Sequence, residues 1–196
     1  MSVTCTCPPP AALPSVSNQV CDEKYGNITR FIFGRTSDPF VDVTDETEFD
    51  TRLAAAGTNK IVLSPFLSDV EFPSSEIIKT AKDDKSSPFG QGFRVGETSP
   101  TVAAMLKNLE ATIKDELKGL ECYEDLGIMI VDSNGGIGAI GSTDFIPISN
   151  FFVGTRGFGG IDEVDTYSVN GDLEPCWDQG LQLNAPTWNP NTKQNS

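Results

Sequence analysis

Residues 126–140 of this chain read LGIMIVDSNGGIGAI, and this stretch decides its fold class. An apolar run at 126–131 is followed by the turn sequence Asp-Ser-Asn-Gly at 132–135 and by a second apolar run at 137–140. Asn-Gly between two such runs is typical of a β-hairpin, because both residues tolerate the positive φ angles of a tight turn. The stretch therefore predicts two antiparallel strands and a β-rich chain.

Strand patterns recur on both sides of this hairpin. Each is a short run of β-branched and aromatic residues bounded by turn residues. The predicted strands are residues 28–33, 60–63, 145–153 and 163–169, and a glycine-rich bend at 154–160 separates the last two. With 18 Gly and 13 Pro in 196 residues, the composition also indicates many turns and few long helices.

One amphipathic helix is predicted at residues 109–119. Apolar residues recur there at spacings of three and four, which places them on one helical face: Leu106, Leu109, Ile113, Leu117 and Leu120. Residues 101–107 fit two interpretations, because Ser99 and Pro100 suit a helix start whereas Thr101 and Val102 favour a strand. Further upstream, Asp45 is expected to cap a short helical turn that ends near Gly57.

The sum is a mainly β (α+β) chain, a β-sandwich or half-barrel of roughly seven to nine strands with one packed helix. The predicted domain spans residues 25–183 and includes a long, glycine-containing loop at 79–97. Residues 1–24 are rich in proline and form an N-terminal arm, interpreted either as a disordered tail or as a docking segment. Residues 184–196 form a second flexible arm.

Charge excludes several function classes. The net charge is −14, from 28 acidic and 14 basic residues, and this field disfavours both nucleic-acid binding and anionic membrane surfaces. No apolar run is long enough to cross a bilayer, and the first ten residues lack the pattern of a secretory signal. We therefore expect synthesis in the cytoplasm and no membrane partner.

Catalysis is also disfavoured. The chain has no histidine, which removes the commonest general base and metal ligand. Gly136, Gly138 and Gly141 match the spacing of a dinucleotide-binding motif, but the residues that follow favour a strand and not the helix that the motif requires. The acidic pairs and clusters are interpreted as solvated faces. We predict no enzyme, no cofactor and no metal site.

The five cysteines are interpreted as free thiols in a reducing compartment. They are Cys5, Cys7, Cys21, Cys122 and Cys176, and their spacing matches neither a zinc site nor a regular disulfide framework.

Several of these features occur together along residues 60–190. They are the run Ser64-Pro65-Phe66, the loop that leads to Val95-Gly96, the helix that ends at Glu121-Cys122, the hairpin at 126–135, and the later runs Phe145-Ile146-Pro147-Ile148 and Phe151-Phe152-Val153-Gly154. In this order the pattern resembles the structural virion proteins of long-tailed bacteriophages, and most of all their tail-tube (major tail) subunit.

The resemblance implies a self-associating subunit of the viral tail. Six copies would close into a ring, rings would stack into a tail tube together with other virion proteins, and DNA would pass through the channel during ejection without specific binding. Candidate inter-subunit contacts are Pro8, Pro9, Pro10, Lys82, Asp83, Asp84, Lys85, Phe89, Phe93 and Trp188. Trp177 and Trp188 are interpreted as anchors, either on a partner or on their own domain.

Acidic residues suggest the wall of the channel. Between Arg156 and Lys193 the chain has no basic residue, and the candidate lumen-facing acids in this interval are Asp162, Glu163, Asp165, Asp172 and Glu174. Such a wall would repel DNA phosphates. The alternatives are a capsid decoration or head–tail connector protein, which would form trimers or one ring, and a non-catalytic receptor-binding module.

Overall fold

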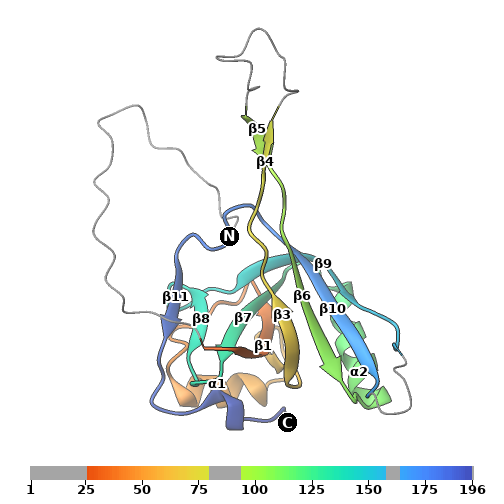
Figure 1. Ribbon diagram of the computed structural model, residues 1–196. Coiled ribbons are helices and arrows are strands. Elements are labelled where there is room, and N and C mark those ends of the chain that lie inside the picture. The colour runs from red at the N-terminus through yellow and green to blue at the C-terminus, as the bar shows by residue number, and fades with distance from the viewer. Residues whose placement is uncertain (1–25, 80–93, 158–163, 196) are drawn as a thin grey trace, which may run out of the picture. The chain divides into compact units, whose positions relative to one another are not determined.

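The computed structural model describes residues 26–79, 94–157 and 164–195 (Figure 1). These residues form a mainly β structure with eleven strands and two α-helices, as the sequence predicts. They fall into two compact units. The first unit comprises residues 26–67, 125–147 and 178–195, and the second comprises 68–124 and 148–177 without the undescribed segments.

The strands of the first unit pair around β7. Strand β7 pairs antiparallel with β1, β8 and the first residues of β9, and β1 also pairs with the short β2 while β11 pairs with β8. The strands are β1 (Ile28–Arg35), β2 (Val62–Leu63), β7 (Leu126–Asp132), β8 (Ile137–Ile140), β9 (Ile146–Val153) and β11 (Leu181–Asn184). The predicted strands at 28–33 and 145–153 are therefore confirmed, whereas the strand expected at 60–63 contains only two residues.

The β7–β8 hairpin confirms the prediction from residues 126–140. Gly135 has a φ of 87°, the left-handed conformation that glycine adopts without strain. The carboxylate of Asp132 is buried in the turn and accepts hydrogen bonds from the backbone N–H groups of Gly26, Asn134 and Gly136, at 3.1, 2.9 and 2.7 Å. The turn is thus held by a buried charge in addition to the backbone conformation of Asn-Gly.

Helix α1 (Glu46–Leu53) packs against this sheet. Asp45 is its N-cap, as predicted, because the Asp45 side chain accepts a hydrogen bond of 2.8 Å from the Thr47 N–H. The buried face of α1 contributes Phe49, whose ring stacks on Phe40 at a centroid distance of 6.1 Å. Phe40 in turn contacts Phe145, so aromatic rings fill the core of the first unit.

The second unit is a four-stranded sheet covered on one face by a helix. Its strands lie in the order β9–β10–β6–β3, with β3 at Leu67–Glu71, β6 at Thr101–Lys107 and β10 at Thr166–Leu173. Helix α2 (Ala111–Gly119) continues into a 3₁₀ turn, η2 (Leu120–Cys122). Two further strands, β4 (Ile77–Lys79) and β5 (Arg94–Glu97), form a separate antiparallel ladder.

These elements show which structure residues 101–107 adopt and where the amphipathic helix begins. Residues 101–107 form a strand, because β6 pairs with β10 along its whole length and alternates between exposed and buried side chains. The amphipathic helix begins at Ala111 rather than at 109, and Leu109 is buried just before it. The predicted loop at 79–97 begins and ends in the β4–β5 ladder, and its residues 80–93 lie outside the described residues.

Two expectations are corrected. Residues 184–195 are not a free arm: they run along the first unit and end in the 3₁₀ turn η3 (Pro190–Thr192) and the segment after it, with side chains hydrogen-bonded to the unit. Cys176 is disulfide-bonded rather than free, whereas Cys122 is a free and exposed thiol. The N-terminal arm at 1–24 lies outside the described residues.

The buried turn carboxylate predicts a large effect of one substitution. Asp132→Ala leaves the buried Gly136 N–H without its acceptor, so we expect a loss of roughly 2–3 kcal/mol in the free energy of unfolding. Urea denaturation measures this loss. The exposed neighbour Ser133 provides the control, Ser133→Ala, and an equal loss in both variants would contradict the role given to the Asp132 carboxylate.

Candidate assembly surface

The sheet of the second unit has one buried and one open face. Residues of β6 and β10 that face each other across the ladder point to the same side, and the pairs Val102–Gly171, Ala104–Val169 and Leu106–Tyr167 are buried. Helix α2 covers that side (Figure 1). Its residue Lys114 places the ammonium nitrogen 5.6 Å from the centre of the Tyr167 ring. The alternate pairs lie on the open face.

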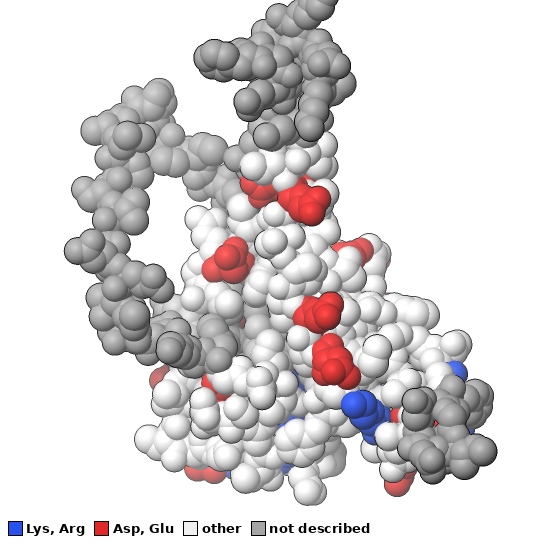
Figure 2. All heavy atoms as spheres, viewed as in Figure 1, with Lys and Arg blue, Asp and Glu red and all other residues white. Residues whose placement is uncertain are grey.

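The open face is mixed: hydroxyl, amide and two charged side chains lie beside the exposed Met105 and Phe152, the latter paired with Asn170. Its paired residues are Thr101–Asp172, Ala103–Asn170, Met105–Ser168 and Lys107–Thr166. In Figure 2 acidic side chains are scattered over the region of β3 and β6, and Lys107 at the end of β6 is 3.7 Å from Asp69. A face of hydroxyl and amide groups with a few acids offers little for a phosphate backbone to bind.

Asp172 is the acid that this face positions most firmly. The hydroxyl of Thr101 donates to one of its oxygens at 2.7 Å, and the amide of Asn150 donates to the other at 2.9 Å. Asn150 has a φ of 49° at a register shift between β9 and β10, and this local bulge aims its amide at Asp172. These hydrogen bonds, from Asn150 first and Thr101 second, lower the pKa of Asp172.

The other predicted lumen acids differ in their surroundings. Asp165 forms an ion pair with Arg156, which compensates its charge. Glu174 follows β10 and is partly exposed. Asp162 and Glu163 lie outside the described residues, so the structure brings Asp172 and Glu174 to the end of β10 and leaves the rest of the predicted set untested.

The predicted inter-subunit residues lie almost entirely outside the described residues. This holds for Pro8, Pro9, Pro10, Lys82, Asp83, Asp84, Lys85, Phe89 and Phe93. Trp188 is described, and its indole N–H donates to the Thr44 carbonyl of its own unit at 2.8 Å. Trp177 also contacts its own unit, with its ring 5.0 Å from that of Phe72. The anchor interpretation on the chain's own domain therefore describes both tryptophans in this structure.

The β4–β5 ladder presents apolar side chains that the sequence analysis did not single out. We call residues 76–79 and 94–98 the ribbon. Ile77, Ile78 and Val95 on it are 54%, 45% and 67% exposed, and its base is closed by the hydrogen bond from the Thr98 N–H to the Glu76 carbonyl at 2.8 Å. Figure 1 shows the ribbon extending from the β3 and β6 end of the second unit. The two adjacent isoleucines Ile77 and Ile78 could have indicated this strand. The charged and polar residues around them made the segment resemble a loop.

Neither a group of metal ligands nor a membrane-spanning helix is found among the described residues. Within 26–79, 94–157 and 164–195, no group of three or more histidine, cysteine, aspartate or glutamate side chains is placed to hold a metal ion. In the same ranges, none of the helices has the length and hydropathy that a transmembrane span requires.

Comparison with known proteins gives a likeness to solved structures and none to families or curated proteins. No family model matches the chain, and no curated protein matches it. A solved structure described as the tail of an empty GTA particle with C6 symmetry matches 76% of this chain and 97% of its own, at 12% sequence identity and a TM-score of 0.38. Such a TM-score does not establish a common fold.

The hydrogen bonds around Asp172 predict its titration. Because its pKa in the folded state is lowered from the ordinary value of 3.8, these bonds contribute stability above that pH and lose it as the pH falls through the folded-state pKa. Asn150→Gly keeps the positive φ and removes the amide, so the Asp172 carboxyl should titrate at a higher pH than in the wild type when followed by NMR. Ser149→Gly is the control, and an unchanged midpoint in Asn150→Gly would contradict the assignment.

Proposed function

We propose that this chain is a structural subunit of a phage-like viral tail, which self-assembles into rings that stack as a tube. The observation that carries the proposal is the ribbon, a two-stranded ladder with three exposed aliphatic side chains. An isolated two-stranded ladder is marginally stable in water, and buried aliphatic side chains each contribute about 1.5–3 kcal/mol. The ribbon therefore gains most of its stability from a partner.

A second copy of the chain fits as that partner. The chain exposes other large apolar residues away from the ribbon, including Val41 and Phe66 in the first unit, which are 84% and 62% exposed. Contact between the ribbon of one copy and a different surface of the next is heterologous, so it propagates into closed rings or into filaments. Both products are components of a stacked tube.

The open face of the second unit suits the wall of a channel. Its hydroxyl and amide groups do not bind phosphate strongly, its apolar side chains Met105 and Phe152 are uncharged, and Asp172 adds a firmly held negative charge. With a net charge of −14 per chain, an assembled channel would repel DNA and let it pass without specific binding. Asp172 and Glu174 are the lumen-facing acids in this proposal.

The remaining parts of the proposal rest on the sequence resemblance. They are six copies per ring, contact with other virion proteins, synthesis in the host cytoplasm and incorporation into the virion. The absence of histidine from the sequence supports a role without catalysis. A capsid decoration protein, a head–tail connector or a receptor-binding module would use the same ribbon on a different partner, and the assembly state of the purified chain separates these alternatives from a tube.

The ribbon predicts a separation between folding and assembly. Ile77→Ser/Val95→Ser removes two exposed side chains, so the subunit should unfold at an unchanged urea concentration but lose large assemblies in sedimentation velocity. Val164→Ser changes an aliphatic side chain outside the ribbon that is 54% exposed, as Ile77 is, so this matched control should assemble like the wild type. Normal assembly of the double ribbon variant would refute the proposed contact.

A further inference from the structure

Two irregular connections join the ribbon to the rest of the second unit. Residues 72–75 link β3 to the ribbon, and residues 99–100 link the ribbon to β6. Hydrogen bonds between Glu76 and Thr98 hold the two strands of the ribbon to each other, but no described strand of the larger sheet pairs with β4 or β5. Backbone hydrogen bonds of the sheet therefore do not fix the direction in which the ribbon points.

A tight turn directly after β10 contacts the chain on both sides of the ribbon's base. The turn is closed by the hydrogen bond from the Trp177 N–H to the Glu174 carbonyl at 3.1 Å. The centre of the Trp177 ring lies 5.0 Å from that of Phe72, which belongs to the connection that enters the ribbon. The sulfur of Cys176 lies 3.4 Å from a carboxylate oxygen of Glu97 on β5, where the chain leaves the ribbon. These contacts all lie within the second unit.

This turn is itself held in place, and we call its residues 174–177 the brace. The Leu173 N–H, just before it, donates to the Pro100 carbonyl at 2.8 Å. Cys176, at the third position of the turn, has a φ of 59°, a left-handed conformation that glycine or asparagine usually adopts there. Strained backbone of this kind persists only where the surrounding structure holds it. Cys176 is also disulfide-bonded, so the brace is anchored by a covalent bond in addition to hydrogen bonds.

The ring contact is the stronger of the two contacts between the brace and the ribbon's base. Because the Cys176 sulfur is part of a disulfide, it has no proton to donate to the Glu97 carboxylate. The Trp177 and Phe72 rings are both half-buried and form a tilted pair with an interplanar angle of 37°. Aromatic pairs attract each other beyond the area that they bury. Trp177 is therefore the residue of the brace on which the direction of the ribbon depends most.

We propose that Trp177 is a positioning residue for assembly, which holds the ribbon in the direction that reaches the next copy. The inference rests on the proposed function, in which the ribbon is the contact between copies. Subunits close into a ring only if each contact is made at the same angle. A ribbon that points in many directions loses this freedom on binding and so binds more weakly. The brace removes the freedom before two copies meet.

The direction of the ribbon is measured by NMR residual dipolar couplings of its backbone N–H groups. The Ile77→Ser/Val95→Ser background is used, because it removes the proposed contact between copies. We expect Trp177→Ala to reduce the ribbon couplings to about half or less, as a rigid segment becomes mobile, and to leave those of the β6–β10 ladder unchanged. Trp177→Phe keeps a ring against Phe72 and should keep the couplings. Ribbon couplings that Trp177→Ala leaves unchanged would overturn the positioning role.

Action through the ring contact is tested by combining variants. Phe72→Ala should lower the ribbon couplings as Trp177→Ala does, and the two substitutions together should add little, because residues that act through one contact are not additive. Tyr123→Ala removes a ring of the same unit that is 48% exposed, and this control should keep the couplings. An equal decrease in the control would mean general loosening of the unit and would remove the assignment to Trp177.

Dependence of assembly on this direction is tested with the ribbon side chains intact. In sedimentation velocity, Trp177→Ala should need a protein concentration about tenfold higher than the wild type or Trp177→Phe to form large assemblies. Assembly of Trp177→Ala at the wild-type concentration, despite lowered couplings, would refute a positioning role in assembly. A wild type that forms no large assemblies would instead contradict the proposed function, and the couplings would still show whether Trp177 holds the ribbon.

Discussion

Burial of β7 on both faces is the constraint on which the first unit depends. All seven of its residues are buried, and it pairs with β1 on one side and with β8 and β9 on the other. Such a strand must be apolar along its length, as residues 126–131 are, and must end in a turn that satisfies its last backbone groups. Asp132 meets the second requirement, because its buried carboxylate accepts hydrogen bonds from the turn N–H groups while the Asn191 side chain donates to its carbonyl.

The acidic residues of the chain serve two different ends. Some are structural: Asp132 fixes the hairpin, Asp45 caps α1, Glu48 pairs with Arg52, and Glu121 accepts from the Val153 N–H at the edge of β9. Asp172 is instead held on the open face by neutral donors, so its charge is oriented without being compensated. The net charge does not tell structural acids from exposed, uncompensated ones. The proposal of an acidic channel wall therefore rests on the placement of Asp172.

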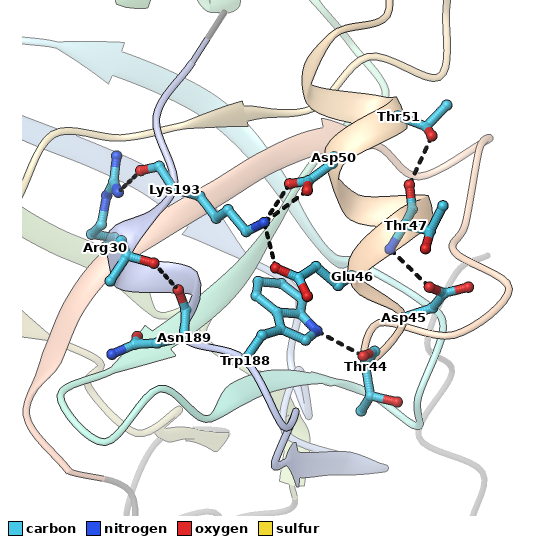
Figure 3. Close-up of polar contacts among 11 residues, drawn as sticks. Arg30, Thr44, Asp45, Glu46, Thr47, Asp50, Thr51, Trp188, Asn189 and Lys193 are labelled. Carbon is cyan, nitrogen blue, oxygen red and sulfur yellow. Dashed lines mark hydrogen bonds and ion pairs between the residues drawn. The ribbon is translucent and has the colours of Figure 1, made fainter.

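The sequence predicted what local patterns encode. The β7–β8 hairpin, strand β1 and the Asp45 cap follow from turn chemistry, alternation and capping, all of which act over a few residues. Residues 101–107 were ambiguous because pairing with β10, some 65 residues later, decides between helix and strand. The attachment of residues 188–195 to the first unit (Figure 3) could not be predicted, since Asn195 and its partner Leu63 are 132 residues apart and a polar segment rich in Asn and Pro resembles a free arm. For the candidate assembly surfaces, the sequence singled out Asp172 as a candidate lumen-facing acid. It did not single out the ribbon, whose two strands flank the predicted loop.

The central claim is that copies of this chain join through the ribbon and enclose a channel. Cryo-electron microscopy of the purified protein across a concentration series tests it most directly. The account predicts rings or stacked tubes in which density connects Ile77 and Val95 to a neighbouring copy and the β6–β10 face carrying Asp172 lines the channel. Monomers at every concentration, or assemblies whose ribbons remain in solvent, would contradict it.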